Sequence, residues 1–172
     1  VDEVFAGKSL VPDTYISPKS PLADPQVKRY SFNPQEANRL LDTVGWLDAD
    51  GNQGTPRQSQ AVAGVPDGTI FQIPLLIVDD PETQRIGQIL VDSLAQCGIS
   101  LELKNLPGEQ LFNAGAGAPL FGRNFTLVEF GWSGAWQPPC FLYTSREIPG
   151  PYPQFQKGWA GSNPSGYSSP DF

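Results

Sequence analysis

Residues 68–106 contain the pattern that most restricts the fold of this chain, because a strand, a helix and a second strand follow one another with short joins. The mostly apolar segment GTIFQIPLLIV, residues 68–78, predicts a strand buried on both faces. The alternation in ISLELKNL, residues 99–106, predicts a second strand. Strands joined in this way run parallel with a right-handed crossover. The sequence therefore predicts an α/β fold, with a small mixed or mostly parallel sheet, packed helices and long ordered loops.

The crossover segment between these strands has the signals of a capped helix. Asp80 suits the N-cap, Pro81 the first helical position and Gly98 the C-terminal stop. Pro74, inside the first strand, predicts that this strand lies at the edge of its sheet or carries a bulge. The apolar stripe of the helix consists of Ile86, Ile89, Leu90, Leu94 and Cys97.

A second capped helix is predicted from Asn33, a good N-cap, to the stop at Gly45, with Pro34 at its start. Its apolar stripe consists of Ala37, Leu40, Leu41 and Val44. A third strand is expected at 124–132. We divide the chain into an extended arm at 1–29, an α/β core at 30–132 and an aromatic, Pro/Gly-rich loop region at 133–172.

The composition excludes several functional classes. The 172 residues carry a net charge of −7 with no dense run of Lys or Arg, which argues against binding nucleic acid through its phosphates. There is no His, so Ser-His and Cys-His catalytic pairs are unavailable, as is the commonest zinc ligand. No cofactor or metal is expected. The two cysteines, Cys97 and Cys140, form either a disulfide or two separate thiols.

Two motifs imitate ligand-binding loops without completing them. Residues 48–59 begin like a calcium loop, but Gln53 stands where the sharp-turn Gly belongs and Ser59 where the closing Glu belongs. The spaced glycines at 115 and 117 lack the Lys and Ser/Thr of a phosphate-binding loop. The first segment is interpreted as a plain turn, and the second as a Gly-Ala loop that follows a short helix in GEQLFNAGAGAP, residues 108–119. The chain has no Met and begins at Val1, which indicates a processed or excised form, with any signal peptide or lipid anchor expected upstream.

The order of the segments resembles that of the bacterial family 5 extracellular solute-binding proteins, the dipeptide- and oligopeptide-binding type that feeds ABC importers. In that family a Y-x-x-D-P-x-x-A-x-x-L-L-x-x-x-G-W helix precedes a D-x-D-G turn, and here Asn33 replaces the usual Asp. The matching residues are Tyr30, Pro34, Ala37, Leu40, Leu41, Gly45, Trp46, Leu94, Gly98, Ile99, Leu101, Leu103, Gly131, Trp132 and the final segment NPSGYSSPDF. The resemblance covers nearly all of this chain and implies part of one lobe of a two-lobed periplasmic-binding-protein fold.

In this family the loop after the Gly-Trp pair lines the ligand cleft, and in dipeptide-binding relatives it reads G-W-T-G-D-x-x-D-P. The first Asp there pairs with the α-amino group of the ligand. This chain reads GWSGAWQPP at 131–139, so the resemblance implies a set of cleft candidates: Trp132, Ser133, Gly134, Ala135 and Trp136. Ala135 replaces the amine-binding Asp and cannot accept a hydrogen bond from an ammonium. Together with the added aromatic Trp136, this favours a sugar, a modified peptide or an organic cation over a free peptide.

The function implied by the resemblance is solute binding by cleft closure, followed by delivery to an ABC-importer permease. The protein would act outside the cytoplasm, in contact with the membrane only through an upstream anchor. Trp132 either contacts the solute or only forms the cleft wall. A structural or interaction module that keeps the lobe without binding a solute is the alternative. An enzyme is not expected, because the carboxylates at 79–82 fit helix capping better than a glycosidase pair.

Overall fold

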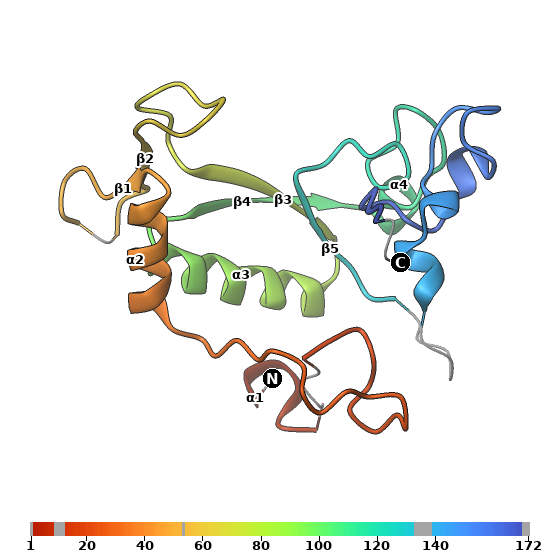
Figure 1. Cartoon of the computed structure of the whole chain (residues 1–172), viewed down its shortest axis with the longest axis horizontal. Coiled ribbons are helices and arrows are strands. Elements are labelled where there is room, and N and C mark those ends of the chain that lie inside the picture. The colour runs from red at the N-terminus through yellow and green to blue at the C-terminus, as the bar shows by residue number, and fades with distance from the viewer. Residues whose placement is uncertain (1, 9–12, 53, 133–138, 170–172) are drawn as a thin grey trace.

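The structure is a computed structural model that describes residues 2–8, 13–52, 54–132 and 139–169 (Figure 1). Its strands are β1 (Trp46–Leu47), β2 (Gln58–Ser59), β3 (Gln72–Val78), β4 (Ser100–Leu106) and β5 (Leu127–Glu129). Its helices are α1 (Asp2–Phe5), α2 (Pro34–Thr43), α3 (Pro81–Ala95) and α4 (Gly108–Leu111). Three 3₁₀ turns follow in the C-terminal region, at η1 (Cys140–Tyr143), η2 (Ser145–Glu147) and η3 (Gly158–Ala160).

The main sheet has three parallel strands in the order β4-β3-β5. The parallel pairing of β3 with β4 runs from Gln72 opposite Ser100 to Val78 opposite Leu106, with α3 as the crossover. The predicted strand-helix-strand unit is therefore confirmed. A separate antiparallel pair, β1 with β2, lies beside α2, at the end of the molecule away from α4 (Figure 1).

The hydrophobic core lies between α3 and one face of the sheet. Leu75 and Ile77 of β3 and Leu101 of β4 are buried there. Leu90, Val91 and Leu94 of α3 pack on them. A Cβ at Gly87 would lie 3.2 Å from Cδ1 of Ile77, so the glycine lets the helix approach the sheet closely. Burying one such aliphatic side chain contributes about 1.5–3 kcal/mol.

The first strand differs from its predicted position and burial. β3 is the central strand of the sheet, so the edge position predicted from Pro74 is wrong. The proline is tolerated because β5 begins opposite Leu75, so at Pro74 the strand pairs with β4 alone. Fully buried residues of β3 occur on the α3 face only, at Leu75 and Ile77, and Leu76 and Val78 on the other face are partly exposed.

The capping of α3 follows the sequence signals. The Asp80 carboxylate accepts hydrogen bonds from the backbone N–H groups of Glu82 and Thr83, both at 3.0 Å. The Thr83 hydroxyl also donates to it at 2.6 Å, and this bond is the largest cause of the lowered pKa of Asp80. At the other end, Gly98 has a φ of +67°, the left-handed conformation expected of a helix stop.

Helix α2 forms as predicted, with Asn33 accepting a hydrogen bond from the backbone N–H of Glu36. Its apolar stripe, however, is not buried within the described residues, and Leu40 and Val44 are 50% and 59% exposed. Trp46, directly after the helix, stacks on Phe71 with ring centroids 4.1 Å apart. This contact ties the β1-β2 pair to the segment that enters β3.

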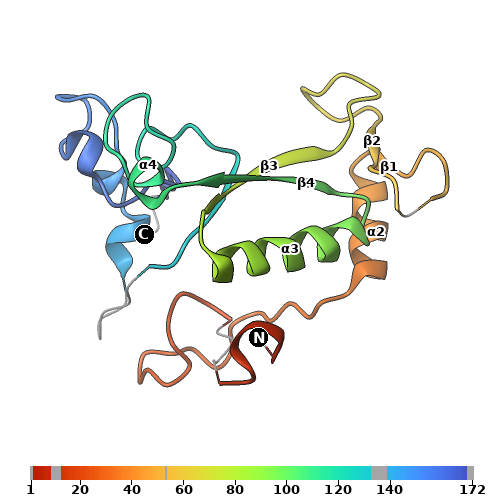
Figure 2. The ribbon, with the colours of Figure 1, turned by 180° about the vertical axis from the view of Figure 1, so that it is seen from behind.

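The N-terminal arm and the C-terminal region pack outside the core. The arm begins with the short helix α1 and runs along the side of α3 that faces away from the sheet (Figures 1 and 2). Tyr15 of the arm meets Tyr143 of the C-terminal region, with ring centroids 4.7 Å apart. The third strand is shorter than the predicted range 124–132, since only Leu127–Glu129 pair with β3.

Candidate functional site

The carboxyl ends of the parallel strands meet at one end of the sheet, which is where ligands bind in open α/β folds. The chain after β4 continues there into α4, and the C-terminal region packs beside it (Figure 1). β5 leads from the same end of the sheet to Trp132, the first of the predicted cleft residues. The remaining cleft candidates, Ser133, Gly134, Ala135 and Trp136, lie outside the described residues.

A pocket of about 340 Å³ lies beside Trp132, between β5 and the C-terminal region. This volume is at the lower end of the range typical of small-molecule sites. Its lining residues are Phe125, Thr126, Leu127, Val128, Phe130, Trp132, Leu142, Tyr143, Pro164 and Ser165. The sequence pointed to Trp132. It gave the residues from 139 onward no role in a site, although the resemblance covers the final segment that contains Pro164 and Ser165.

Edge-to-face aromatic contacts hold Trp132 against β5. The rings of Phe130 and Trp132 have centroids 5.8 Å apart with an interplanar angle of 62°. Phe112, after α4, packs on the other side of Phe130 at 5.5 Å and 83°. Pairs in this geometry contribute about 0.5–1.5 kcal/mol beyond their buried area. Trp132 remains 39% exposed, so its ring is both positioned by packing and accessible to a ligand.

The opposite wall of the pocket is fixed by Asn163, which is fully buried. Its Nδ2 donates to the backbone carbonyls of Thr144 at 3.0 Å and Tyr167 at 2.8 Å. Its Oδ1 accepts from the hydroxyl of Ser165 at 2.8 Å. These bonds join the segment after η1 to the segment that carries Pro164, so both parts of this wall are held together.

Aromatic packing supports the same wall from behind. Tyr143 contacts Tyr15 of the arm and also packs edge-on against Tyr167 at 6.2 Å. The pocket is therefore built from three regions of the chain: β5 and its continuation, the C-terminal region, and the arm that backs Tyr143.

Glu129 lies next to the pocket in sequence but is not one of its lining residues. In the register of the parallel pair it stands opposite Ile77, which packs against α3. Its Oε2 is buried without a hydrogen-bond partner among the described residues. Burial raises the pKa of Glu129, and the nearby carboxylates of Asp80 and Glu82 raise it further. The carboxyl group faces the first turn of α3 rather than the pocket.

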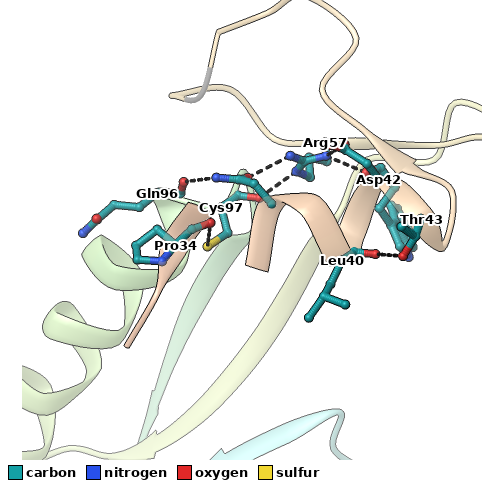
Figure 3. A network of polar contacts seen from close by, with 9 residues as sticks. Pro34, Leu40, Asp42, Thr43, Arg57, Gln96 and Cys97 are labelled. Atoms are coloured by element: carbon teal, nitrogen blue, oxygen red, sulfur yellow. Dashed lines mark hydrogen bonds and ion pairs between the residues drawn. The ribbon is translucent and has the colours of Figure 1, made fainter. Parts of the chain in front are cut away.

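A second, more polar hollow of about 680 Å³ lies between α2 and the C-terminal end of α3. The buried Arg57 bonds two of its lining residues, Asn38 and Asp42, and further groups nearby (Figure 3). Its Nε donates to the Cys97 carbonyl at 2.9 Å, its Nη1 to the Trp46 carbonyl at 2.6 Å, and its Nη2 to Oδ1 of Asn38 at 2.8 Å. Sequence reasoning missed Arg57, because its partners lie up to 40 positions away and no local pattern marks them.

The two cysteines are separate free thiols, one buried and one exposed. Burial raises the pKa of the Cys97 thiol, which lies 3.9 Å from the Pro34 carbonyl oxygen. Within the described ranges, no cluster of three or more His, Cys, Asp or Glu side chains is arranged to hold a metal ion. In the same part of the chain, no helix combines the length and the apolar character needed to cross a bilayer.

Comparison with curated proteins finds the oligopeptide-binding protein OppA of Mycobacterium bovis, and its counterpart in Mycobacterium tuberculosis. Each is 32% identical to this chain over 108 residues, which is 60% of this chain and 15% of the relative. The chain therefore spans a small part of the length of the curated relatives it matches.

Among solved structures, an oligopeptide-binding protein from Thermus thermophilus complexed with a pentapeptide matches 98% of this chain and 28% of its own, with a TM-score of 0.74 and 23% identity. AppA from Bacillus subtilis, in complex with a nonapeptide, matches 99% and 30%, with a TM-score of 0.66 and 21% identity. At these identities the likeness establishes the fold. The family model of bacterial extracellular solute-binding proteins, family 5, middle region, matches residues 1–153, and this chain belongs to that family.

Proposed function

We propose that this chain forms part of one lobe of a solute receptor that delivers its ligand to an ABC-importer permease. The observation that carries the proposal is the pocket beside Trp132, at the end of the sheet where the strands terminate. Family membership supports the same interpretation. In this proposal residues 1–29 act as an arm, 30–132 as the α/β core and 133–172 as the loop region of the lobe.

The proposed mechanism is binding without chemistry. Two lobes close around the solute, and the closed form is recognised by the permease. The lobe described here contributes Trp132 and the apolar pocket beside it to the solute-binding cleft. The protein acts outside the cytoplasm, held at the membrane by an anchor that precedes this chain.

The residue at 135 supports a solute other than a free-amine peptide. The solved relatives hold a pentapeptide and a nonapeptide. Here the position of the amine-binding Asp is Ala135, whose methyl group cannot accept a hydrogen bond. A charge-assisted hydrogen bond contributes about 1.5–3 kcal/mol, so its loss removes the advantage of a free ammonium. A modified peptide, a sugar or an organic cation is the proposed solute.

Native mass spectrometry tests this function on the natural protein that contains this chain, called the parent protein below. A retained small molecule of defined mass would support a receptor, and its addition to the emptied protein should raise the melting temperature. A modified peptide, sugar or organic cation would support the argument from Ala135, whereas a free-amine peptide would contradict it. If extracts of the growth medium yield no stabilising solute, the lobe is a structural or interaction module instead.

A further inference from the structure

The pocket beside Trp132 has an uncharged lining. The polar side-chain groups among its described lining residues are the hydroxyls of Thr126, Tyr143 and Ser165 and the indole N–H of Trp132, and no lining side chain is of an acidic or basic type. The nearest carboxylate in sequence, Glu129, lies on the α3 face of the sheet, opposite Ile77. The sequence from Ser133 to Pro138 contains no ionisable side chain.

The volume of the pocket fits a group larger than a single ring. An apolar cavity of about 150 Å³ binds benzene. The present pocket, at about 340 Å³, is roughly twice that size and has room for a two-ring or branched aliphatic group. Apolar lining residues come from both walls, with Val128 and Phe130 on β5 and its continuation and Leu142 and Pro164 across from them.

Both walls of the pocket are held by contacts within the protein itself. β5 is held by its pairing with β3, and Trp132 by the ring of Phe130. Across the pocket, the hydrogen bonds of Asn163 hold the segments that carry Tyr143 and Pro164. A preformed apolar site binds a matching group without an ordering cost. It disfavours a charged group, because no described lining residue carries an opposite charge that would compensate the desolvation.

We propose, on the basis of the function above, that this pocket binds an uncharged apolar part of the solute, such as an aromatic ring system or a branched alkyl group. An ammonium or carboxylate group is excluded from it. The proposal narrows the candidate solutes to those with a bulky apolar moiety, for example a peptide with a capped amine and an aromatic side chain. Unmodified sugars and small organic cations do not meet this requirement.

The test compares three probes that share a two-ring frame and differ in charge: quinoline, N-methylquinolinium and 2-naphthoate. Their binding to the parent protein, freed of retained solute, is measured at neutral pH by ligand-observed NMR titration. We expect quinoline to bind at least about tenfold more tightly than either charged probe, because only the neutral ring enters without uncompensated desolvation. Equal or tighter binding of a charged probe would overturn the proposal.

Variants at Leu142, which lines the pocket, test whether the probes bind there. Leu142→Asp should weaken quinoline binding about tenfold and strengthen binding of N-methylquinolinium, because the new carboxylate faces the bound ring. Leu142→Asn introduces a side chain of the same size without the charge. It should weaken the binding of quinoline without strengthening the binding of N-methylquinolinium. Leu40→Asp is the same change on the exposed face of α2, and it should alter the affinity for neither quinoline nor N-methylquinolinium. A reversal of charge preference is a result that misfolding does not produce, and its absence in a folded variant contradicts the proposal.

The two proposals fail in different ways. If the parent protein retains a solute that quinoline does not displace, the proposal for the apolar pocket is wrong, while the receptor function stands. If no solute is found but quinoline binds with the predicted preference and responds to the Leu142 variants, the pocket stands and the receptor function is contradicted.

Discussion

Arg57 and Asp42 form an ion pair in which Nη1 lies 2.5 Å from Oδ1, yet the two side chains differ greatly in environment. The Arg57 side chain is 5% exposed and that of Asp42 55% exposed. The arginine also donates to two backbone carbonyls, those of Trp46 and Cys97, and to the Asn38 side chain. The pair is thus one part of a junction that joins α2, β1 and the end of α3 (Figure 3).

This difference predicts unequal effects of removing the two partners. Arg57→Ala leaves buried carbonyl groups without donors and should destabilise the lobe by about 2–4 kcal/mol. Asp42→Asn removes only a solvent-screened charge and should cost about 0–1 kcal/mol. Native-state hydrogen exchange of the α3 and β4 amides in the parent protein measures both. Equal losses in the two variants would show that the ion pair, rather than the carbonyl contacts, holds the junction.

Glu129 should make the stability of the lobe depend on pH. Its folded pKa is raised, chiefly by burial, so its contribution to stability is complete below the unfolded pKa and is lost as pH rises through the folded pKa. Glu129→Gln should therefore raise the melting temperature at neutral pH and leave it nearly unchanged in acid. Thermal unfolding across this pH window checks the prediction. Leu127→Gln, on the same strand, is the control, and its effect on the melting temperature should be the same at every pH.

The contribution of Asp80 to stability should depend on pH in the opposite direction to that of Glu129. Hydrogen bonds, first that of the Thr83 hydroxyl, lower its pKa, so its stabilisation is present above the unfolded pKa and fades as pH falls through the folded pKa. Asp80→Ala should lower the stability at neutral pH through loss of the N-cap. Asp80→Asn keeps a capping oxygen and should retain most of the stability. Urea titrations of the two variants separate capping from charge, and an Asn variant as unstable as the Ala variant would contradict the capping role.

Asn163 should control the pocket more than the core. Asn163→Ala removes two partly buried hydrogen bonds, those donated to the carbonyls of Thr144 and Tyr167, each of which contributes about 0.5–1.5 kcal/mol. We expect faster hydrogen exchange in residues 139–169 and weaker quinoline binding, with β3 and β4 protected as before. Ser165→Ala, which removes one weaker contact, should have a smaller effect on both measurements. Equal loss of protection in β3 would show that the two regions unfold together.

The regular part of the fold was predictable because its signals are local. The caps Asn33 and Asp80 and the stop at Gly98 mark helix ends within a few residues, and the alternation in β4 marks its buried face. The position of β3 in the sheet was not predictable in the same way. Pro74 signals an unpaired side, but the unpaired side is created by where β5 begins, which the sequence around Pro74 does not contain.

The site was only partly predictable for the same reason. Trp132 was singled out through a Gly-Trp motif and lines the pocket, and its contact with a solute stays a prediction. The opposing wall depends on Asn163, whose hydrogen bonds span 19 residues to Thr144 and 4 to Tyr167 within a segment of no repeating pattern. Whether Ser133, Gly134, Ala135 and Trp136 contact a solute stays a prediction.

The strand order β4-β3-β5 also determines when the pocket can form during synthesis. β3, α3 and β4 follow one another without interruption, so they can assemble as soon as residue 106 has left the ribosome. β5 is added next to β3 only after residue 129, and the wall held by Asn163 only once residue 163 has followed. In chain order, the wall of the pocket that Asn163 holds therefore follows all three strands of the sheet on which the pocket is built.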